Sequence, residues 1–176
     1  RNPGMTKEEQ ETELKKILNV NKIIWLKEGA AEDPFGWGTL IVKNYFGIGV
    51  KGHIDEFCRF VNENTILISF PDSAEAEHDP IKKINLERMK VNYDILKNAT
   101  DQNGKSFNIV EMPVPDIDYM TFALDTVSKN DEIKFLSQQI LFEQKNFSVG
   151  DTVHFVPSSS YLNFLITNKT VFQAKY

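Results

Sequence analysis

The stretch from residue 53 to residue 112 constrains the fold most, because three strand-like runs and one amphipathic segment follow one another closely. Residues 54–61 and 65–70 each predict a strand, and the Asn-Glu-Asn triplet between them predicts a hairpin. Asp79 and Pro80 are typical of a helix start. The helix is predicted to carry an apolar stripe at three-to-four spacing, formed by Leu86, Met89, Tyr93 and Leu96. Residues 107–112 predict a third strand, so the order is ββαβ.

The residues before this unit contain signals for one helix and for weaker strands. Thr6 and Glu9 have the spacing of a capping box, and the apolar stripe after them predicts a helix over residues 7–18. Residues 22–26 are apolar and predict a buried strand. Three further segments complete this part of the prediction: a loop at 29–38, a weak strand at 39–42, and a glycine-broken loop against a core or ligand at 45–49.

The pattern is less regular beyond residue 112. Residues 133–140 predict a short helix, with a partly stranded segment as the alternative. Residues 160–166 and 170–174, with a turn between them, predict a second hairpin. The predicted class is therefore α+β. The chain would hold the end of one module, a complete ββαβ module at about residues 53–112, and the opening hairpin of another.

Composition excludes several classes of function. The chain has 176 residues, enough for one domain, and its formal net charge of −5 without a basic cluster argues against nucleic-acid binding. No apolar run of about 18 residues predicts a membrane span, and we expect a cytoplasmic protein. Cys58 is the only cysteine, so no intrachain disulfide can form. On the predicted strand it faces away from Asp55, and we expect a buried core thiol.

His53 and Asp55 form the candidate catalytic pair. In a strand, residues two apart point to the same face, about 6.5–7 Å from one another. An imidazole can move a proton near neutral pH, and a carboxylate can hold a cation such as a guanidinium. Gly52 would let the backbone pass close to whatever the pair contacts. From spacing alone, an edge histidine beside a solvated aspartate is the commoner explanation of such a pair.

The flanking residues add a family resemblance. Val50-Lys51-Gly52-His53-Ile54-Asp55 resembles the GHxD-centred strand of the agmatine deiminase and bacterial peptidylarginine deiminase family. Shorter segments are similar to the same family in the same order along the chain: Arg1-Asn2-Pro3-Gly4, Ile24-Trp25-Leu26-Lys27-Glu28-Gly29, Ser69-Phe70-Pro71-Asp72 and Ser160-Tyr161-Leu162-Asn163-Phe164. The resemblance implies a pentein fold, an α/β propeller of ββαβ modules, of which this chain would be an interior fragment of about two modules.

The resemblance also implies an activity. The family hydrolyses a guanidine to a urea and ammonia through a cysteine thiolate, which would make the chain part of an enzyme converting agmatine to N-carbamoylputrescine, a step of polyamine biosynthesis. His53 would be the general acid and base, and Asp55 would clamp the guanidinium. The family's thiolate position lies beyond the late hairpin, and Cys58 does not match it. The fragment alone is therefore expected to be inactive.

Two substrates and one other class of function stay open. Peptidylarginine is the alternative to agmatine, because the Glu28-to-Gly52 segment is longer than in typical agmatine deiminases. A non-catalytic binding module of the same fold is the other alternative. Weaker substrate-binding candidates are Asp72, on the loop after a strand, and Trp37, by cation–π contact. His78 with Asp79 has no metal-ligand spacing. We expect no cofactor and no metal, and we keep a homodimer open.

Overall fold

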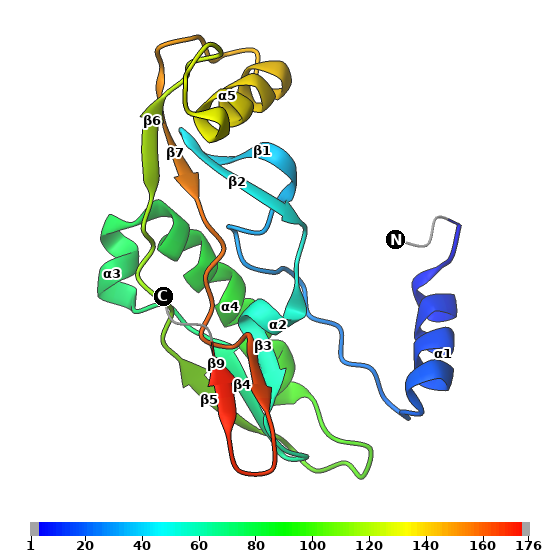
Figure 1. Ribbon diagram of the computed structural model, residues 1–176. Helices are drawn as coiled ribbons and strands as arrows, with labels where there is room; N and C mark the ends of the chain where they lie inside the picture. Colours follow the sequence, from blue (N-terminus) through cyan, green and yellow to red (C-terminus); the bar gives the residue numbers. More distant parts are fainter. Residues whose placement is uncertain (1–3, 174–176) are drawn as a thin grey trace.

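The computed structural model describes residues 4–173 and has a mixed α+β fold (Figure 1). Its helices are α1 (Lys7–Leu18), α2 (Ile54–Phe57), α3 (Ser73–His78), α4 (Pro80–Asn98) and α5 (Asp131–Glu143). Its strands are β1 (Phe35–Val42), β2 (Tyr45–Val50), β3 (Cys58–Phe60), β4 (Thr65–Ser69), β5 (Asn108–Met112), β6 (Met120–Ala123), β7 (Thr152–Val156), β8 (Phe164–Ile166) and β9 (Val171–Gln173).

The first structural unit is a three-stranded sheet in the order β3-β4-β5, packed against α4. β3 and β4 form an antiparallel hairpin, and β5 returns parallel to β4 after the two helices. This arrangement confirms the predicted strand, helix and strand at 65–112. The apolar stripe of α4 is buried as expected, because Met89 and Leu96 pack against Ile66 and Ile68 of β4.

The second structural unit is a four-stranded sheet in the order β1-β2-β7-β6, covered by α5 (Figure 1). β1 and β2 are antiparallel, and β2 pairs in parallel with β7, more than one hundred residues later. The predicted loop at 45–49 is therefore wrong, because these residues are a strand. Gly47 and Gly49 were interpreted as signs of a loop, but they are needed for close packing, because a side chain at either position would collide with the Asp33–Pro34 segment.

The two units are built from interleaved segments and meet at a small apolar junction. The core of the second unit is formed by Phe46, Phe122, Leu124, Leu136, Ile140 and Val153. The junction consists of Ala31, Ile81 and Val156, which come from the loop before β1, from α4 and from β7. Figure 1 shows the second unit at one end of the molecule, the β3-β4-β5 sheet toward the other, and α4 between them. Residues 133–140 belong to α5, so the helical prediction is confirmed.

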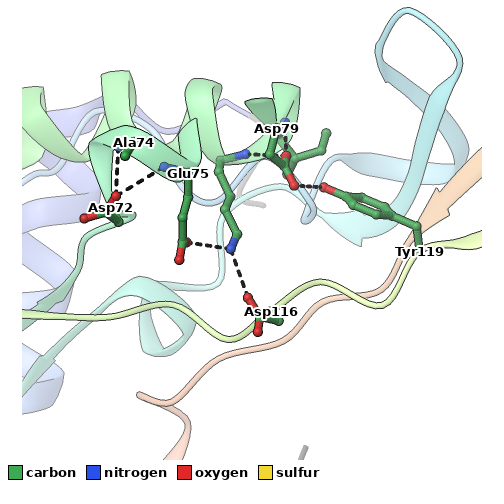
Figure 2. A network of polar contacts seen from close by, with 8 residues as sticks. Asp72, Ala74, Glu75, Asp79, Asp116 and Tyr119 are labelled. Carbon is green, nitrogen blue, oxygen red and sulfur yellow. Dashed lines mark hydrogen bonds and ion pairs between the residues drawn. The ribbon is translucent and has the colours of Figure 1, made fainter. Parts of the chain in front are cut away.

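A polar network ties the segment after β5 to the start of α4 (Figure 2). Lys82 is 6 % exposed, and its ammonium contacts Glu75 at 2.7 Å and Asp116 at 3.2 Å. Asp79 caps α4 through the amides of residues 81 and 82, and its other carboxylate oxygen accepts a 2.6 Å hydrogen bond from Tyr119. Burial and this bond raise the pKa of Tyr119. The network therefore fixes the path of the chain between the two units.

Three predictions for segments outside the central module have different outcomes. The capping box of Thr6 and Glu9 is present, and α1 spans residues 7–18 as predicted. The strand predicted at 22–26 is wrong: that segment pairs with no strand among the described residues, although Ile24 and Leu26 pack against the first unit's core. The late hairpin is confirmed as β8 and β9. Residue 174 of its predicted second strand, and residues 1–3 of the upstream resemblance, lie outside the described residues.

Candidate active site

His53 lies at the N-cap of α2, in extended backbone, with its side chain 49 % exposed. The prediction that residues 54–61 form one strand is wrong, because Ile54–Phe57 is a helical turn and β3 begins only at Cys58. His53 and Asp55 therefore do not share the face of a strand, contrary to the prediction. Asp55 is half-buried in the first turn of α2, and its side chain makes no hydrogen bond or ion pair within residues 4–173.

Asp33 is the residue that contacts His53. Its carboxylate Oδ2 lies 3.1 Å from His53 Nδ1 and accepts hydrogen bonds from the amides of Gly52 and His53, both at 2.7 Å. Its Oδ1 accepts a hydrogen bond from the Val50 amide at 2.8 Å. Burial by itself raises the pKa of Asp33, but the three amide donors and His53 outweigh it, and the pKa is lowered. Asp33 is thus held as a carboxylate at neutral pH.

The loop that carries Asp33 is held in place by polar side chains of α4. Asn92 accepts a hydrogen bond from the Lys27 amide and donates one to the Glu28 carbonyl. Asn85 accepts from the Ala31 amide and donates to the Glu32 carboxylate at 2.7 Å. These contacts satisfy the backbone of a loop that is buried against the helix. The position of Asp33 is therefore set by the first unit's long helix.

Two further acidic groups lie close to the His53–Asp33 pair. Glu56 follows Asp55 in α2, and burial together with the nearby Asp33 charge raises its pKa, against the opposing effect of His53. Glu32 is 7 % exposed, and burial raises its pKa despite its hydrogen bond from Asn85. The His53–Asp33 pair thus has Glu56 beside it and Glu32 next to Asp33 in the chain, and these carboxylates differ in proton affinity, as is typical of sites that move protons.

The segment just before the late hairpin holds α2 in place through hydrogen bonds. The Ser160 hydroxyl donates to the Glu56 carbonyl and accepts from the Leu162 amide. Arg59 donates to the Leu162 carbonyl at 3.2 Å, and its guanidinium lies 4.5 Å from the Phe164 ring centroid. The Ser160-to-Phe164 segment that carried part of the family resemblance therefore positions the helical turn that follows His53.

The weaker sequence candidates lie elsewhere. Asp72 is the N-cap of α3 and accepts hydrogen bonds from the amides of residues 74 and 75 (Figure 2). Trp37 lies on β1 and packs edge-to-face against Phe135 of α5, with ring centroids 5.6 Å apart. Within residues 4–173, neither side chain makes a hydrogen bond, ion pair or ring contact with His53. A groove of about 730 Å³ opens beside Gly52, and its lining includes Phe35 but not Trp37.

A cation could be placed by geometry at one cluster within residues 4–173. Single ligand atoms of Asp33, His53 and Glu56 lie within 4.8 Å of one another. Asp33 Oδ2 is nevertheless already engaged by two amides and faces the imidazole. The Asp33 carboxylate is therefore better suited to accept a hydrogen from the His53 ring than to bind a metal ion.

Asp33 and Glu56 were missed by sequence reasoning for different reasons. Asp33 lies twenty positions before His53, and no periodicity links the two. The β1–β2 hairpin between them closes at its base and brings the pair together. Glu56 was missed because a strand would have placed it opposite His53 and Asp55, whereas a helical turn does not.

The candidate site is thus an exposed imidazole beside a buried carboxylate, a pair whose chemistry suits proton transfer, on a mixed α+β fold. Sequence comparison supplies the family. The model of the Porphyromonas-type peptidyl-arginine deiminases matches residues 1–176, and the chain belongs to that family. Resemblance to the agmatine deiminase and bacterial peptidylarginine deiminase family is thereby confirmed.

Curated relatives support the same placement. The chain is 30 % identical over 168 residues to the agmatine deiminase of Pseudomonas syringae pv. syringae (strain B728a), covering 96 % of this chain and 36 % of the relative. It is 33 % identical over 121 residues to the agmatine deiminase of Medicago truncatula, covering 69 % of this chain and 27 % of the relative. The chain thus spans about a third of these proteins, which are guanidine-modifying hydrolases.

Solved structures show the shared fold. The agmatine deiminase of Enterococcus faecalis superposes with a TM-score of 0.59 at 22 % identity, covering 97 % of this chain and 37 % of that one. An agmatine deiminase of C. jejuni with substrate bound gives a TM-score of 0.54 at 22 % identity, covering 97 % of this chain and 34 % of that one. No helix within residues 4–173 is long and apolar enough to cross a membrane.

Proposed function

We propose that this chain is part of an enzyme that hydrolyses the guanidine of agmatine to N-carbamoylputrescine and ammonia. The observation that carries the proposal is the half-exposed His53 beside the buried Asp33, in a chain that the family model matches over residues 1–176. The chain would form about two ββαβ modules of a pentein propeller, with the complete module at about residues 53–112. The propeller is proposed from the resemblance and from the β3-β4-α4-β5 order.

In the proposed reaction, His53 transfers protons and Asp55 holds the substrate. A thiolate attacks the guanidinium carbon, and the C–N bond breaks as His53 gives a proton to the departing ammonia. His53 then takes a proton from water, which attacks the same carbon and releases the thiolate and the urea. Asp55, whose carboxylate has no described partner, holds the guanidinium by paired N–H contacts.

The thiolate is proposed to come from outside these residues. Cys58 is half-buried against the first unit's core, and burial raises its pKa to about 12. A thiol in that state is a poor nucleophile near neutral pH. The reaction therefore needs a cysteine supplied by another part of the protein, and the isolated 176 residues are expected to be inactive.

Peptidylarginine is the second candidate substrate, and the groove beside Gly52 is the observation that favours it. Its walls include Trp25, Phe35 and Phe57, and Glu28 lies in the lining with Arg88. An open, half-apolar groove of about 730 Å³ could accept flanking peptide residues. A free small guanidine would not need this space.

The test uses a longer protein that contains this chain and a candidate thiolate. Agmatine, arginine and a peptidylarginine are assayed side by side for ammonia release. His53→Ala is expected to lower turnover at least about 100-fold, because general acid–base catalysis contributes roughly that much or more. Asp55→Asn should chiefly weaken binding.

His78→Ala is the matched control, since His78 is an exposed histidine at the end of α3. It should retain full turnover and the same circular dichroism spectrum as the parent. Unchanged turnover in the folded His53→Ala protein would refute the role of His53. Absence of ammonia release from all three substrates by the parent would favour the non-catalytic binding module.

A further inference from the structure

The Asp33 carboxylate is a rigid acceptor rather than a mobile one. Its side chain is 1 % exposed, whereas the imidazole it contacts is 49 % exposed. Three backbone amides fix both of its oxygens, and the loop that carries it is anchored to α4 by Asn85 and Asn92. An acceptor held this firmly can impose an orientation on a more exposed partner.

We propose that Asp33 is a positioning residue that holds the neutral His53 imidazole as its Nδ1–H tautomer and leaves Nε2 to exchange protons with the substrate. The proposal rests on the proposed role of His53. It adds a residue that the GHxD segment does not contain. Asp33 itself would touch neither the substrate nor the reacting atoms.

The tautomer follows from the chemistry of the pair. A neutral imidazole carries one N–H, and the other nitrogen has a lone pair. A carboxylate can only accept, so the 3.1 Å contact of Nδ1 with Asp33 Oδ2 favours the tautomer that carries its hydrogen on Nδ1. The lone pair is then on Nε2. After Nε2 takes a proton, the cation formed is stabilised by the same buried carboxylate.

The same carboxylate also closes the base of the β1–β2 hairpin. Its two oxygens accept hydrogen bonds from the backbone amide of Val50, at the end of β2, and from that of Gly52, just after β2. Gly52 has a φ of +93°, which an L side chain rarely adopts, so the turn into His53 depends on glycine. A Cβ at Gly49 would collide with Asp33 Oδ1 and with backbone atoms of Asp33 and Pro34. Gly49→Ala should therefore displace the Asp33–Pro34 segment, and the carboxylate with it, without changing the chemistry of the carboxylate.

The experiment measures imidazole nitrogens by ¹⁵N NMR in the 176-residue chain at pH 8, with His53 assigned through His53→Gln. The wild-type spectrum should show His53 as the Nδ1–H tautomer. Asp33→Asn, Asp33→Ala and Gly49→Ala should all reduce that preference. Asp55→Asn, a matched removal of a nearby carboxylate, should leave it unchanged.

An Nε2–H tautomer in the wild-type chain would overturn the proposal, and that measurement needs no variant to fold. An unchanged Nδ1–H preference in folded Asp33→Ala would also overturn it. In the longer enzyme, Asp33→Asn should lower kcat by about 10–100-fold with little change in KM, as for other residues that orient a catalytic histidine. If His53→Ala retains turnover but the tautomer result holds, the proposed function fails while the Asp33–His53 pairing stands.

Discussion

At the scale of single residues, the hydrogen-bond donors around a buried or half-buried group decide whether it stays ionised. Asp33 is buried, but three backbone amides donate to its carboxylate and His53 lies beside it, so it stays ionised. Cys58 is half-buried without such donors, so its neutral thiol is favoured. The prediction of a core thiol for Cys58 agrees with its contacts in the first unit.

Cys58 should therefore react slowly with thiol reagents. A pKa near 12 leaves roughly a thousandfold less thiolate at pH 8 than in an unfolded chain, whose thiol has a pKa of about 8.5. Labelling of the folded chain should be at least about 100-fold slower than labelling in 6 M guanidinium chloride, as measured by mass spectrometry. Labelling at the unfolded rate would contradict this account of its burial.

At the scale of elements, helix starts were the most predictable features and short strands the least. The Asp79–Pro80 and Thr6–Glu9 signals are local, and both helices begin where these residues predicted. The strand at 45–50 pairs with β1 and also with β7, which lies more than one hundred residues later. The distant partner could not be seen in the local sequence, where the glycines favoured a loop. Residues 22–26 show the opposite error, because a strand was predicted there and none formed. An apolar run needs a neighbouring strand to hydrogen-bond with, and this one has none among the described residues.

Asp79→Ala should cost more stability than Asp72→Ala, although each residue caps a helix. Loss of a cap costs about 1 kcal/mol, and Asp79→Ala also leaves the partly buried Tyr119 hydroxyl without its acceptor. We expect the free energy of unfolding to fall by about 2–3 kcal/mol for Asp79→Ala and by about 1 kcal/mol for Asp72→Ala in urea titrations. Equal losses would show that the Tyr119 contact adds nothing.

At the scale of the whole molecule, the candidate site lies where the two units join. The chain leaves the first unit at Asp33, builds the β1–β2 hairpin, and returns at His53. The apolar junction of Ala31, Ile81 and Val156 holds the units together nearby. We therefore expect the two units to unfold in one transition.

Ile81→Ala should destabilise both units together, by about 2–4 kcal/mol, because Ile81 is fully buried at their junction. In a Trp25→Phe background, Trp37 fluorescence reports the second unit and far-ultraviolet circular dichroism reports the whole chain. The two probes should give coincident urea transitions in the parent and in Ile81→Ala. Val91→Ala, on the exposed face of the same helix, is the control and should change stability by less than about 0.5 kcal/mol. Separate transitions in the parent would show that the units are independent.

Local sequence determined the helix caps, the apolar stripe of α4, the β3–β4 hairpin and the family-matched GHxD segment. Each depends on residues within a few positions of one another, where propensity and side-chain spacing act directly. Only the tertiary structure decided that residues 54–57 are helical, that 45–50 is a strand, and that Asp33 contacts His53. Those outcomes depend on contacts between distant segments, which backbone hydrogen bonding and burial select only when the whole chain is folded.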